Sequence, residues 1–268
     1  MLIILHGLES GSEATQVRGL LLAAHRLGWQ GLAVNFRSCG KEPNRLKRSY
    51  HAGETSDLAW VIERLSAAFP EVSMVCVGLS LGGNVLLKYL GEQGEAAPRA
   101  LKAAVAISAP FNLAICAHAF EQGVLNREYM RRLVRSFKRK TLAKLKRFPD
   151  LVDRRRLAAV RTIAEFDEVL TAPVHGFSSA EHYWQASSCA QYLPAIRRPT
   201  LLINAKDDPV VPASVLPLSP TTWNSFLTAV FPDAGGHVGF VSGPSPIRPV
   251  LWAEEKALAF FHRYVRNS

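Results

Sequence analysis

Short apolar runs rich in β-branched residues alternate along the chain with longer stretches in which apolar residues recur every three or four positions. The first pattern is typical of a buried strand, and the second of an amphipathic helix. Six strands are expected, at Leu2–Leu5, Leu32–Phe36, Val72–Val77, Ala103–Ile107, Thr200–Asn204 and Phe226–Phe231. Helices are expected near Glu13–Leu27, Asp57–Ala68, Leu81–Leu90 and Trp252–Val265. This alternation predicts an α/β protein with a mostly parallel sheet and helices on both faces.

The alternation stops after the fourth strand, because residues 113–188 contain helical patterns and no strand-like run. We expect a helical cap inserted within a single domain that spans residues 1–268, an ordinary length for one α/β domain. Within this cap, seven mostly apolar residues recur at three- and four-residue steps, with Lys and Arg between them: Met130, Leu133, Val134, Phe137, Thr141, Leu145 and Phe148. That spacing predicts a basic amphipathic helix.

The positive charge of the chain is concentrated around this helix. The formal net charge is +10, and residues 127–161 alone contain fourteen Lys or Arg against three Asp or Glu, a balance of +11. A solvated helix face is one interpretation, and contact with an anionic membrane or with nucleic acid is another. Nucleic acid is disfavoured, because Phe137 and Phe148 lie on the apolar stripe and not between the charges, where base stacking would need them.

Composition also narrows the environment of the protein. No apolar run approaches the roughly 18 residues of a membrane-spanning helix, and the apolar start lacks the basic region of a signal peptide. The four cysteines (Cys39, Cys76, Cys116 and Cys189) lie far apart and form no C-x-x-C pair. Neither zinc nor a disulfide framework is therefore expected, and reduced thiols fit a cytoplasmic protein that contacts a membrane at most peripherally.

A G-x-S-x-G pentapeptide, Gly78-Leu-Ser-Leu-Gly82, lies between the third expected strand and the helix at Leu81–Leu90. In that context the serine occupies a sharp strand-to-helix turn, which requires small residues two positions before and after it. The turn holds the hydroxyl at a helix N-terminus, where the helix dipole favours developing negative charge. A glycine-rich turn without chemistry is the alternative, but the flanking strand and helix favour Ser80 as a nucleophile.

A serine nucleophile needs a neutral imidazole to take its proton and a carboxylate to orient that imidazole. Where the serine sits on such a turn, the acid and then the histidine follow it in the chain. Two of the eight histidines follow the last expected strand, and only His237 lies in the loop after it, because His262 falls within the last expected helix. Asp207 and Asp208 both follow the strand before it, and in related hydrolases the acid usually lies four residues before a proline. That spacing from Pro212 favours Asp208 over Asp207.

Acyl transfer places negative charge on a carbonyl oxygen, which backbone N–H groups can stabilise. In the α/β-hydrolase fold one N–H comes from the residue after the nucleophile, and another comes from the loop after an earlier strand. These positions are Leu81 and Leu8, although His6-Gly7 before Leu8 could be no more than a strand end. The chain thus predicts an α/β-hydrolase fold with a Ser80, His237 and Asp208 triad.

Several functions are compatible with these residues. A serine hydrolase would cleave small acyl or lipid-like carboxylic esters through an acyl-enzyme. The same triad could serve an acyltransferase or a thioesterase. A non-catalytic binding protein that uses the basic insertion is a third possibility, against which the intact triad argues. Ser80 also argues against dehalogenases and epoxide hydrolases of this fold, because those enzymes use a carboxylate nucleophile.

The chain resembles the YheT-type α/β hydrolases, a family of predicted esterases and lipases. The matching stretches run nearly end to end: Leu5-His-Gly-Leu8, Asn35-Phe-Arg-Ser-Cys-Gly40, Tyr50-His-Ala-Gly-Glu-Thr55, Gly78-Leu-Ser-Leu-Gly-Gly-Asn84, Phe166-Asp167, Thr171-Ala-Pro-Val-His-Gly-Phe177, Asn204-Ala-Lys-Asp-Asp-Pro209 and Gly235-Gly-His237. The resemblance implies carboxylic-ester hydrolysis by Ser80, Asp208 and His237 without a metal or organic cofactor.

Two further features of the family pattern concern structure and have no assigned role in the reaction. Arg37, Cys39, His51 and His175 recur in the family pattern, and we expect them to be structural. The family usually has several dozen residues before its His-Gly strand, whereas here that strand opens at Met1. The first strands of the fold are therefore expected to be missing, which would leave an uncovered sheet edge that invites association.

Overall fold

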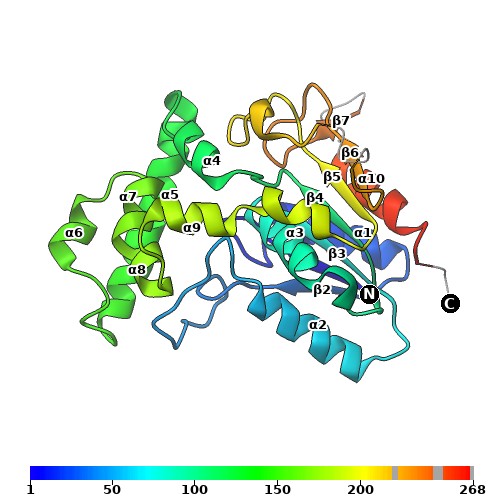
Figure 1. The fold of residues 1–268 in the computed structure, drawn as a ribbon, viewed down its shortest axis with the longest axis horizontal. Helices are drawn as coiled ribbons and strands as arrows, with labels where there is room; N and C mark the ends of the chain where they lie inside the picture. Colours follow the sequence, from blue (N-terminus) through cyan, green and yellow to red (C-terminus); the bar gives the residue numbers. More distant parts are fainter. Residues whose placement is uncertain (219–222, 244–249, 266–268) are drawn as a thin grey trace.

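A six-stranded parallel sheet forms the centre of the computed structural model, which describes residues 1–218, 223–243 and 250–265. The strand order is β2-β1-β3-β4-β5-β6 (Figure 1). The bounds are β1 Leu2–Leu5, β2 Gly31–Val34, β3 Met74–Leu79, β4 Leu101–Ile107, β5 Thr200–Ile203 and β6 Leu227–Val230. All six strands overlap the predicted positions, and the predicted fold class is confirmed.

Helices cover both faces of the sheet, because successive strand residues point to opposite sides. Leu2 and Ile4 pack in one apolar cluster with α1 (Thr15–Arg26) and α10 (Trp252–Phe261). Ile3 and Leu5 pack in the other cluster with α2 (Ser56–Ala68) and α3 (Leu81–Gln93). All four β1 residues are buried, which explains why this strand has no polar face.

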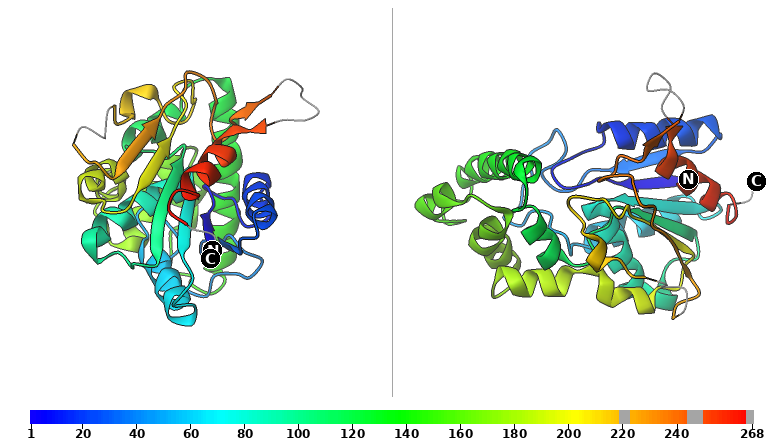
Figure 2. Two further views of the ribbon diagram at one scale, coloured as in Figure 1. Left: turned by 90° about the vertical axis from the view of Figure 1, so that its right-hand side faces the viewer. Right: turned by 90° about the horizontal axis from the view of Figure 1, so that it is seen from above.

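The chain between β4 and β5 is helical, as the absence of strand-like runs predicts. Its helices are α4 Leu113–Ala119, α5 Val124–Leu145, α6 Arg154–Ala159, α7 Ile163–Phe166, α8 Ala172–His175 and α9 Ala180–Ser187, with a π-helical turn at Asp167–Thr171 and a 3-10 helix at Cys189–Ala195. Helices α4 to α8 gather at one end of the molecule, beyond the carboxyl ends of the strands (Figures 1 and 2). We name residues 113–188 the helical segment.

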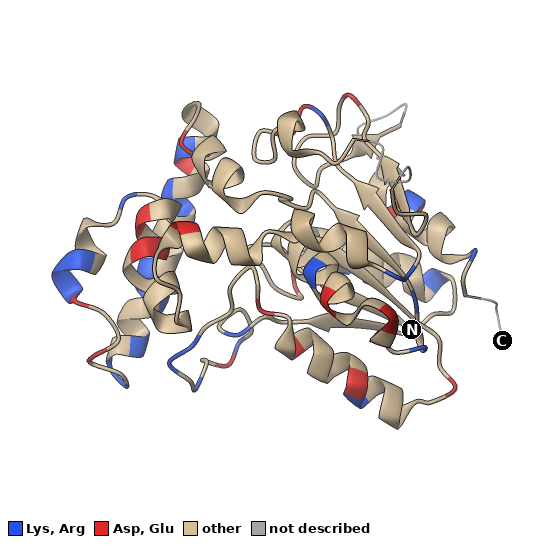
Figure 3. Cartoon of the chain, in the orientation of Figure 1, with Lys and Arg blue, Asp and Glu red and all other residues tan. Residues whose placement is uncertain are grey.

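Helix α5 is the predicted basic amphipathic helix. Met130, Leu133, Val134, Thr141 and Leu145 are buried along its inner stripe. The helix ends at Leu145, so the prediction that Phe148 continues the stripe within the helix is wrong: Phe148 lies in the following turn. Lys and Arg residues mark the outer parts of this end of the molecule (Figure 3). Among the described residues, no helix combines the length and the apolar character needed to cross a membrane.

Some element bounds differ from the prediction for local reasons. β3 begins at Met74 because Val72 is still part of the preceding turn, where its N–H donates to the Phe69 carbonyl at 3.1 Å. A small antiparallel pair, β7 (Val241–Ser242) and β8 (Val250–Leu251), was not expected. Strands of two residues are too short for an alternation pattern to be visible in the sequence. Two further 3-10 turns lie at Gly94–Ala96 and Ala213–Val215.

Backbone strain is concentrated in the connections that follow the strands. Among the described residues, six that are not glycine have a positive φ angle, and each lies in a loop after a strand: Glu9, Ser38, Ser80, Ser108, Val238 and Phe240. Such angles are uncommon for residues with a side chain, and they cluster where surrounding structure holds a functional geometry. The carboxyl edge of the sheet is therefore the place to look for a site.

Candidate active site

Ser80 occupies the turn between β3 and α3 with φ 51° and ψ −118°. The two glycines of the pentapeptide are required by contacts with backbone. A Cβ atom on Gly78 would overlap the Gly82 carbonyl, and one on Gly82 would overlap the carbonyl of Leu5 on the neighbouring strand. Helix α3 begins at Leu81, directly after Ser80. The Ser80 hydroxyl therefore lies at the N-terminus of the helix, which is the positive end of the helix dipole.

His237 lies between Ser80 and Asp208 in one hydrogen-bonded row. Its Nε2 is 2.9 Å from Ser80 Oγ, and its Nδ1 is 2.8 Å from Asp208 Oδ2. A carboxylate only accepts hydrogen bonds, so Nδ1 carries the proton and Nε2 is the acceptor for the serine hydroxyl. The Asp208 side chain is fully buried, and that of His237 is 13% exposed. The structure thus brings together the three residues that the sequence placed in separate loops.

The two neighbouring aspartates have different partners. Besides His237, Asp208 accepts hydrogen bonds at Oδ1 from the N–H groups of Val210 and Val211, at 2.8 and 3.0 Å. Asp207 points elsewhere, and its Oδ1 accepts from the N–H groups of Gly235 and Gly236, at 2.9 and 2.8 Å. The sequence favoured Asp208 over Asp207 as the partner of the histidine, and only Asp208 contacts it.

Ser108 is a contributor to the site that the sequence did not indicate. It is fully buried with φ 53° directly after β4, and its Oγ accepts a hydrogen bond from the Val238 N–H at 3.1 Å. Val238 follows His237 and has an unfavourable φ of 52° for a β-branched residue. Ser108 therefore helps to fix the loop that presents the imidazole. A lone serine at a strand end carries no sequence pattern that could have revealed this role.

The loop after β1 lies directly against Ser80. A Cβ atom on Gly7 would approach the Ser80 Cβ to 3.3 Å, so Gly7 permits this close passage. Leu8 and Leu81 both line the pocket that contains Ser80 and His237. In the described part of the chain, neither Leu8 nor Leu81 donates its backbone N–H to a protein acceptor. These are the two N–H groups expected from the sequence to face a developing oxyanion.

The pocket at Ser80 is an apolar chamber, which we name the apolar lobe. Most of its wall residues come from the helical segment: Leu113, Cys116, Ala117, Phe120, Tyr129, Ile163, Asp167 and Trp184. Pro110 from the loop after β4 and Val210 from the loop after β5 complete the wall. Burial raises the pKa of Cys116 to about 12, so this thiol is neutral and acts as an apolar wall. The lining of this chamber therefore suits a hydrocarbon group.

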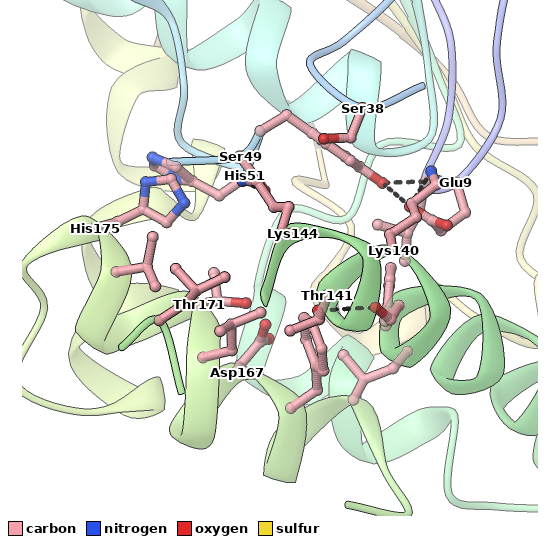
Figure 4. Close-up of a pocket in the computed structure, with 18 of the residues that line it drawn as sticks. Glu9, Ser38, Ser49, His51, Lys140, Thr141, Lys144, Asp167, Thr171 and His175 are labelled. Carbon is pink, nitrogen blue, oxygen red and sulfur yellow. Dashed lines mark hydrogen bonds and ion pairs between the residues drawn. The ribbon is translucent and has the colours of Figure 1, made fainter. Parts of the chain in front are cut away.

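A second chamber adjoins the first at Leu8, Leu81, Ile163 and Asp167. We name it the polar lobe because charged and imidazole side chains lie among its apolar wall residues: Glu9, Lys47, His51, Lys140, Lys144 and His175. Figure 4 shows His51 and His175 side by side at one end of it and Glu9 at the other. The two imidazole rings are 4.4 Å apart, and burial lowers the pKa of His51 to about 3 and that of His175 to about 4. Both histidines are neutral at pH 7, so they offer hydrogen bonds without charge.

Asp167 lines both lobes, and it is a buried carboxyl group close to Ser80 and His237 in the wall of the apolar lobe. Its side chain lies in the π-helical turn, and its Oδ2 accepts from Trp184 Nε1 at 2.9 Å. Burial raises the pKa of the Asp167 carboxyl to about 6, against hydrogen bonds from Thr171 and Trp184 that lower it. The sequence marked Phe166-Asp167 only as part of a family pattern. A π-helical turn at this position is a feature that often accompanies functional sites.

Two further residues of the family pattern have local partners. Arg37 donates from Nε to Asp57 Oδ2 at 2.6 Å and so ties the loop after β2 to the start of α2. Cys39 is half-buried, its Sγ accepts from Lys140 Nζ at 3.8 Å, and burial raises the pKa of its thiol to about 11. Within residues 1–218, 223–243 and 250–265, no three His, Cys, Asp or Glu side chains are grouped so that they could hold a metal ion.

Comparison with known proteins places this geometry in a family. The profile of the α/β hydrolase fold family matches residues 1–244. YheT of Escherichia coli is 38% identical over 257 residues, which cover 95% of this chain and 74% of YheT. The chain belongs to the α/β-hydrolase fold family. Its resemblance to the YheT-type branch, first recognised from short motifs, is confirmed.

More distant proteins share the fold. The monoacylglycerol lipase of Saccharomyces cerevisiae is 29% identical over 98% of this chain, but the chain spans only 59% of that protein. The crystal structure of the Pyrococcus furiosus esterase Pf2001 superposes with a TM-score of 0.63 at 19% identity, over 99% of this chain and 82% of the esterase. At that identity the superposition shows the fold alone.

Proposed function

We propose that this protein is a serine hydrolase that cleaves carboxylic esters through an acyl-enzyme intermediate. The observation that carries the proposal is the continuous row from Ser80 Oγ through His237 to Asp208, with distances of 2.9 and 2.8 Å. Each member has the partner its role needs, and the row opens into a chamber that can hold an acyl chain. The names of two relatives, a monoacylglycerol lipase and a phospholipase, support an ester as the substrate.

The reaction follows from the hydrogen bonds. His237 Nε2 takes the Ser80 proton as Oγ attacks the ester carbonyl carbon, and Asp208 stabilises the imidazolium that forms. The tetrahedral intermediate collapses when the imidazolium returns the proton to the leaving alcohol, which leaves an acyl group on Ser80. A water molecule, deprotonated by the same imidazole, then attacks the acyl carbon, releases the carboxylic acid and restores the serine.

The negative charge of both tetrahedral intermediates requires donors that are already in place. The N–H of Leu81 points from the N-terminus of α3, and the N–H of Leu8 comes from the loop that passes Ser80. Both lie in the pocket wall beside the nucleophile. A single donor of this kind contributes about 2.7–4 kcal/mol of transition-state stabilisation in serine hydrolases. We therefore assign the oxyanion hole to Leu8 and Leu81.

The two lobes suggest how an ester is oriented. The apolar lobe contains both Ser80 and His237 and matches a hydrocarbon acyl chain. The polar lobe begins on the other side of Leu8 and Leu81, where an alcohol group would leave the carbonyl carbon. Because the helical segment supplies most of the apolar wall, we infer that residues 113–188 act as a cap that selects the acyl group.

The basic surface of residues 127–161 belongs to the same proposal, as a contact with an anionic membrane that holds lipid-like esters. An apolar tip precedes it on α5, where Val124 is 77% and Leu125 86% exposed. The cations Arg127 and Arg135 are exposed farther along the helix. Apolar residues that insert beside cations are typical of peripheral contact, and each cation adds about 1 kcal/mol at an anionic surface.

Vesicle co-sedimentation tests this contact. The wild type should bind vesicles that contain anionic lipid at low salt, bind less at moderate salt, and fail to bind neutral vesicles. A double substitution, Val124→Asp with Leu125→Asp, should weaken binding while hydrolysis of a water-soluble ester stays unchanged. Equal binding to both kinds of vesicle without salt dependence would leave the basic face as a solvated surface, and tight salt-sensitive binding to nucleic acid would replace the membrane as partner.

The enzymatic proposal is tested by covalent labelling and by turnover. A fluorophosphonate should label the wild type at Ser80, and p-nitrophenyl esters of increasing chain length should be hydrolysed. Ser80→Ala should abolish both signals in a protein with an unchanged melting temperature. A wild type that the fluorophosphonate does not label would contradict catalysis and favour a binding protein. If the wild type is labelled but transfers the acyl group to an alcohol faster than to water, the protein is an acyltransferase. If it is labelled but cleaves thioesters in place of esters, it is a thioesterase.

A further inference from the structure

Glu9 has an unusual environment for a surface-loop carboxylate. It is the residue after Leu8, it adopts φ 54°, and its side chain is only 5% exposed. Lys140 Nζ and Tyr50 Oη donate to its Oε1 at 2.9 and 3.0 Å, and Ser136 Oγ donates to its Oε2 at 2.6 Å. Charge-assisted hydrogen bonds of this kind are roughly twice as strong as neutral ones, so this side chain is firmly held.

The backbone of the same residue is fixed as well. The Glu9 N–H donates to Tyr50 Oη at 2.9 Å, so one hydroxyl binds both the backbone and the side chain of Glu9. The Tyr50 ring in turn stacks on Phe36, with centroids 5.5 Å apart and planes 6° from parallel. The peptide group that links Leu8 to Glu9 is therefore anchored to a rigid aromatic pair.

The peptide group on the other side of Leu8 is fixed through His6. The Phe36 N–H donates to His6 Nε2 at 3.1 Å, so His6 Nδ1 carries the proton and donates to the Gly7 carbonyl at 2.7 Å. In a trans peptide the N–H points opposite to the C=O of the same plane. Fixing the Gly7 carbonyl thus fixes the direction of the Leu8 N–H, and the Glu9 contacts hold the next peptide group, so Leu8 is held from both sides.

We propose that Glu9 is a positioning residue for the oxyanion hole, and that it links the Leu8 N–H to helix α5 of the helical segment. Ser136 and Lys140 are four residues apart on α5, so both lie on one face of the helix toward Glu9. Figure 4 shows Lys140 reaching Glu9 at the end of the polar lobe. The inference rests on the proposed ester hydrolysis, because it concerns a donor that acts only in that reaction.

The test compares two substitutions at Glu9. Glu9→Ala removes all three side-chain contacts and should lower kcat about 10- to 100-fold with little change in KM, because a displaced donor weakens only transition-state binding. The affinity for a trifluoromethyl ketone matched to the acyl chain should fall by the same factor as kcat/KM. Glu9→Gln keeps an oxygen for Tyr50 and Lys140 and an amide for Ser136, so it should restore kcat to within about fivefold of wild type.

Glu54 offers a matched control, since it is a buried carboxylate that accepts from Arg48 and Ser56 and forms no hydrogen bond or ion pair with residues 6–9 in the described structure. Glu54→Ala should lower the melting temperature about as much as Glu9→Ala does, but it should leave the affinity for the trifluoromethyl ketone unchanged. If Glu9→Ala does not fold, Tyr50→Phe and Ser136→Ala each remove one hydroxyl and should still lower kcat several-fold. A folded Glu9→Ala enzyme with wild-type kcat and ketone affinity would overturn the inference, whereas a wild type that hydrolyses no ester would overturn the proposed function instead.

Discussion

Asp207 and Asp208 hold the same loop, residues 235–237, at two different points: Asp207 through the amides of Gly235 and Gly236, and Asp208 through the His237 imidazole. Asp208→Asn should therefore lower kcat by about 10⁴-fold, because an amide cannot stabilise the imidazolium and favours the wrong tautomer. Asp207→Asn keeps an oxygen acceptor and should cost less than about tenfold. Steady-state kinetics of both variants decide the matter, and the reverse order of activities would reassign the acid.

Removing the Ser108 hydroxyl should loosen the loop that carries the base. In Ser108→Ala the partly buried Val238 N–H loses its acceptor, a change that costs about 1 kcal/mol of unfolding free energy. We expect a lower melting temperature together with a several-fold loss of kcat/KM. Ser66→Ala is the matched control, because the buried Ser66 hydroxyl has no hydrogen-bond partner in the described structure. Lower stability with unchanged kinetics would restrict Ser108 to a structural role.

The apolar lobe should limit acyl-chain length. Ala117 lies buried in its wall on α4, so Ala117→Phe would fill the space that a long chain needs. The ratio of kcat/KM for p-nitrophenyl decanoate to that for the acetate should fall at least about tenfold, since each excluded methylene loses about 0.8 kcal/mol of burial. Ile115→Phe, on the exposed side of the same helix, should leave this ratio unchanged. A parallel loss for both esters would place the acyl chain elsewhere.

Asp167 should make folding stability depend on pH. Burial raises the pKa of its carboxyl to about 6, whereas an aspartate in an unfolded chain titrates near 3.9. Between these values the folded protein keeps a proton that the unfolded chain has released. The contribution of Asp167 therefore falls as pH rises through this window, and the deficit is complete above pH 6.

Asp167→Asn removes that titration while keeping an oxygen for Trp184. Relative to wild type, the variant should gain up to about 3 kcal/mol of unfolding free energy on going from pH 4 to pH 8. Urea unfolding at several pH values measures the difference. Comparison with wild type cancels the opposite contribution of His51 and His175, whose lowered pKa values destabilise the fold on acidification. If the difference in unfolding free energy between the variant and the wild type did not change with pH, burial would not raise the pKa of the Asp167 carboxyl.

The strands, and the fact that Ser80, His237 and Asp208 lie together, could be predicted because the patterns are local. β5, β6 and the pentapeptide each show their character within a few residues, and the fold then dictates which loops meet. Asp208 was separable from Asp207 only by its distance from Pro212. In the structure the reason is physical, since the Val210 and Val211 amides hold Asp208 beneath the imidazole.

The remaining contributors act across long sequence distances, so no local pattern reveals them. Glu9 meets Ser136 over 127 residues, and Ser108 meets Val238 over 130. His51 and His175 form a pair only because the loop after β2 folds against α8. Each of these residue types is common in ordinary loops, and only the folded arrangement distinguishes them.

The six positive φ angles after the strands carry a consequence for protein engineering. Each strained residue reduces stability by about 1–3 kcal/mol, and glycine would relieve that strain without a clash at Cβ. At Ser80, Glu9 and Ser108 such relief would remove side chains on which the site depends. A screen that selects only for heat stability, without requiring activity, should therefore find substitutions at the carboxyl edge of the sheet. Screens that also demand turnover should collect theirs at the opposite edge and in the outer helices.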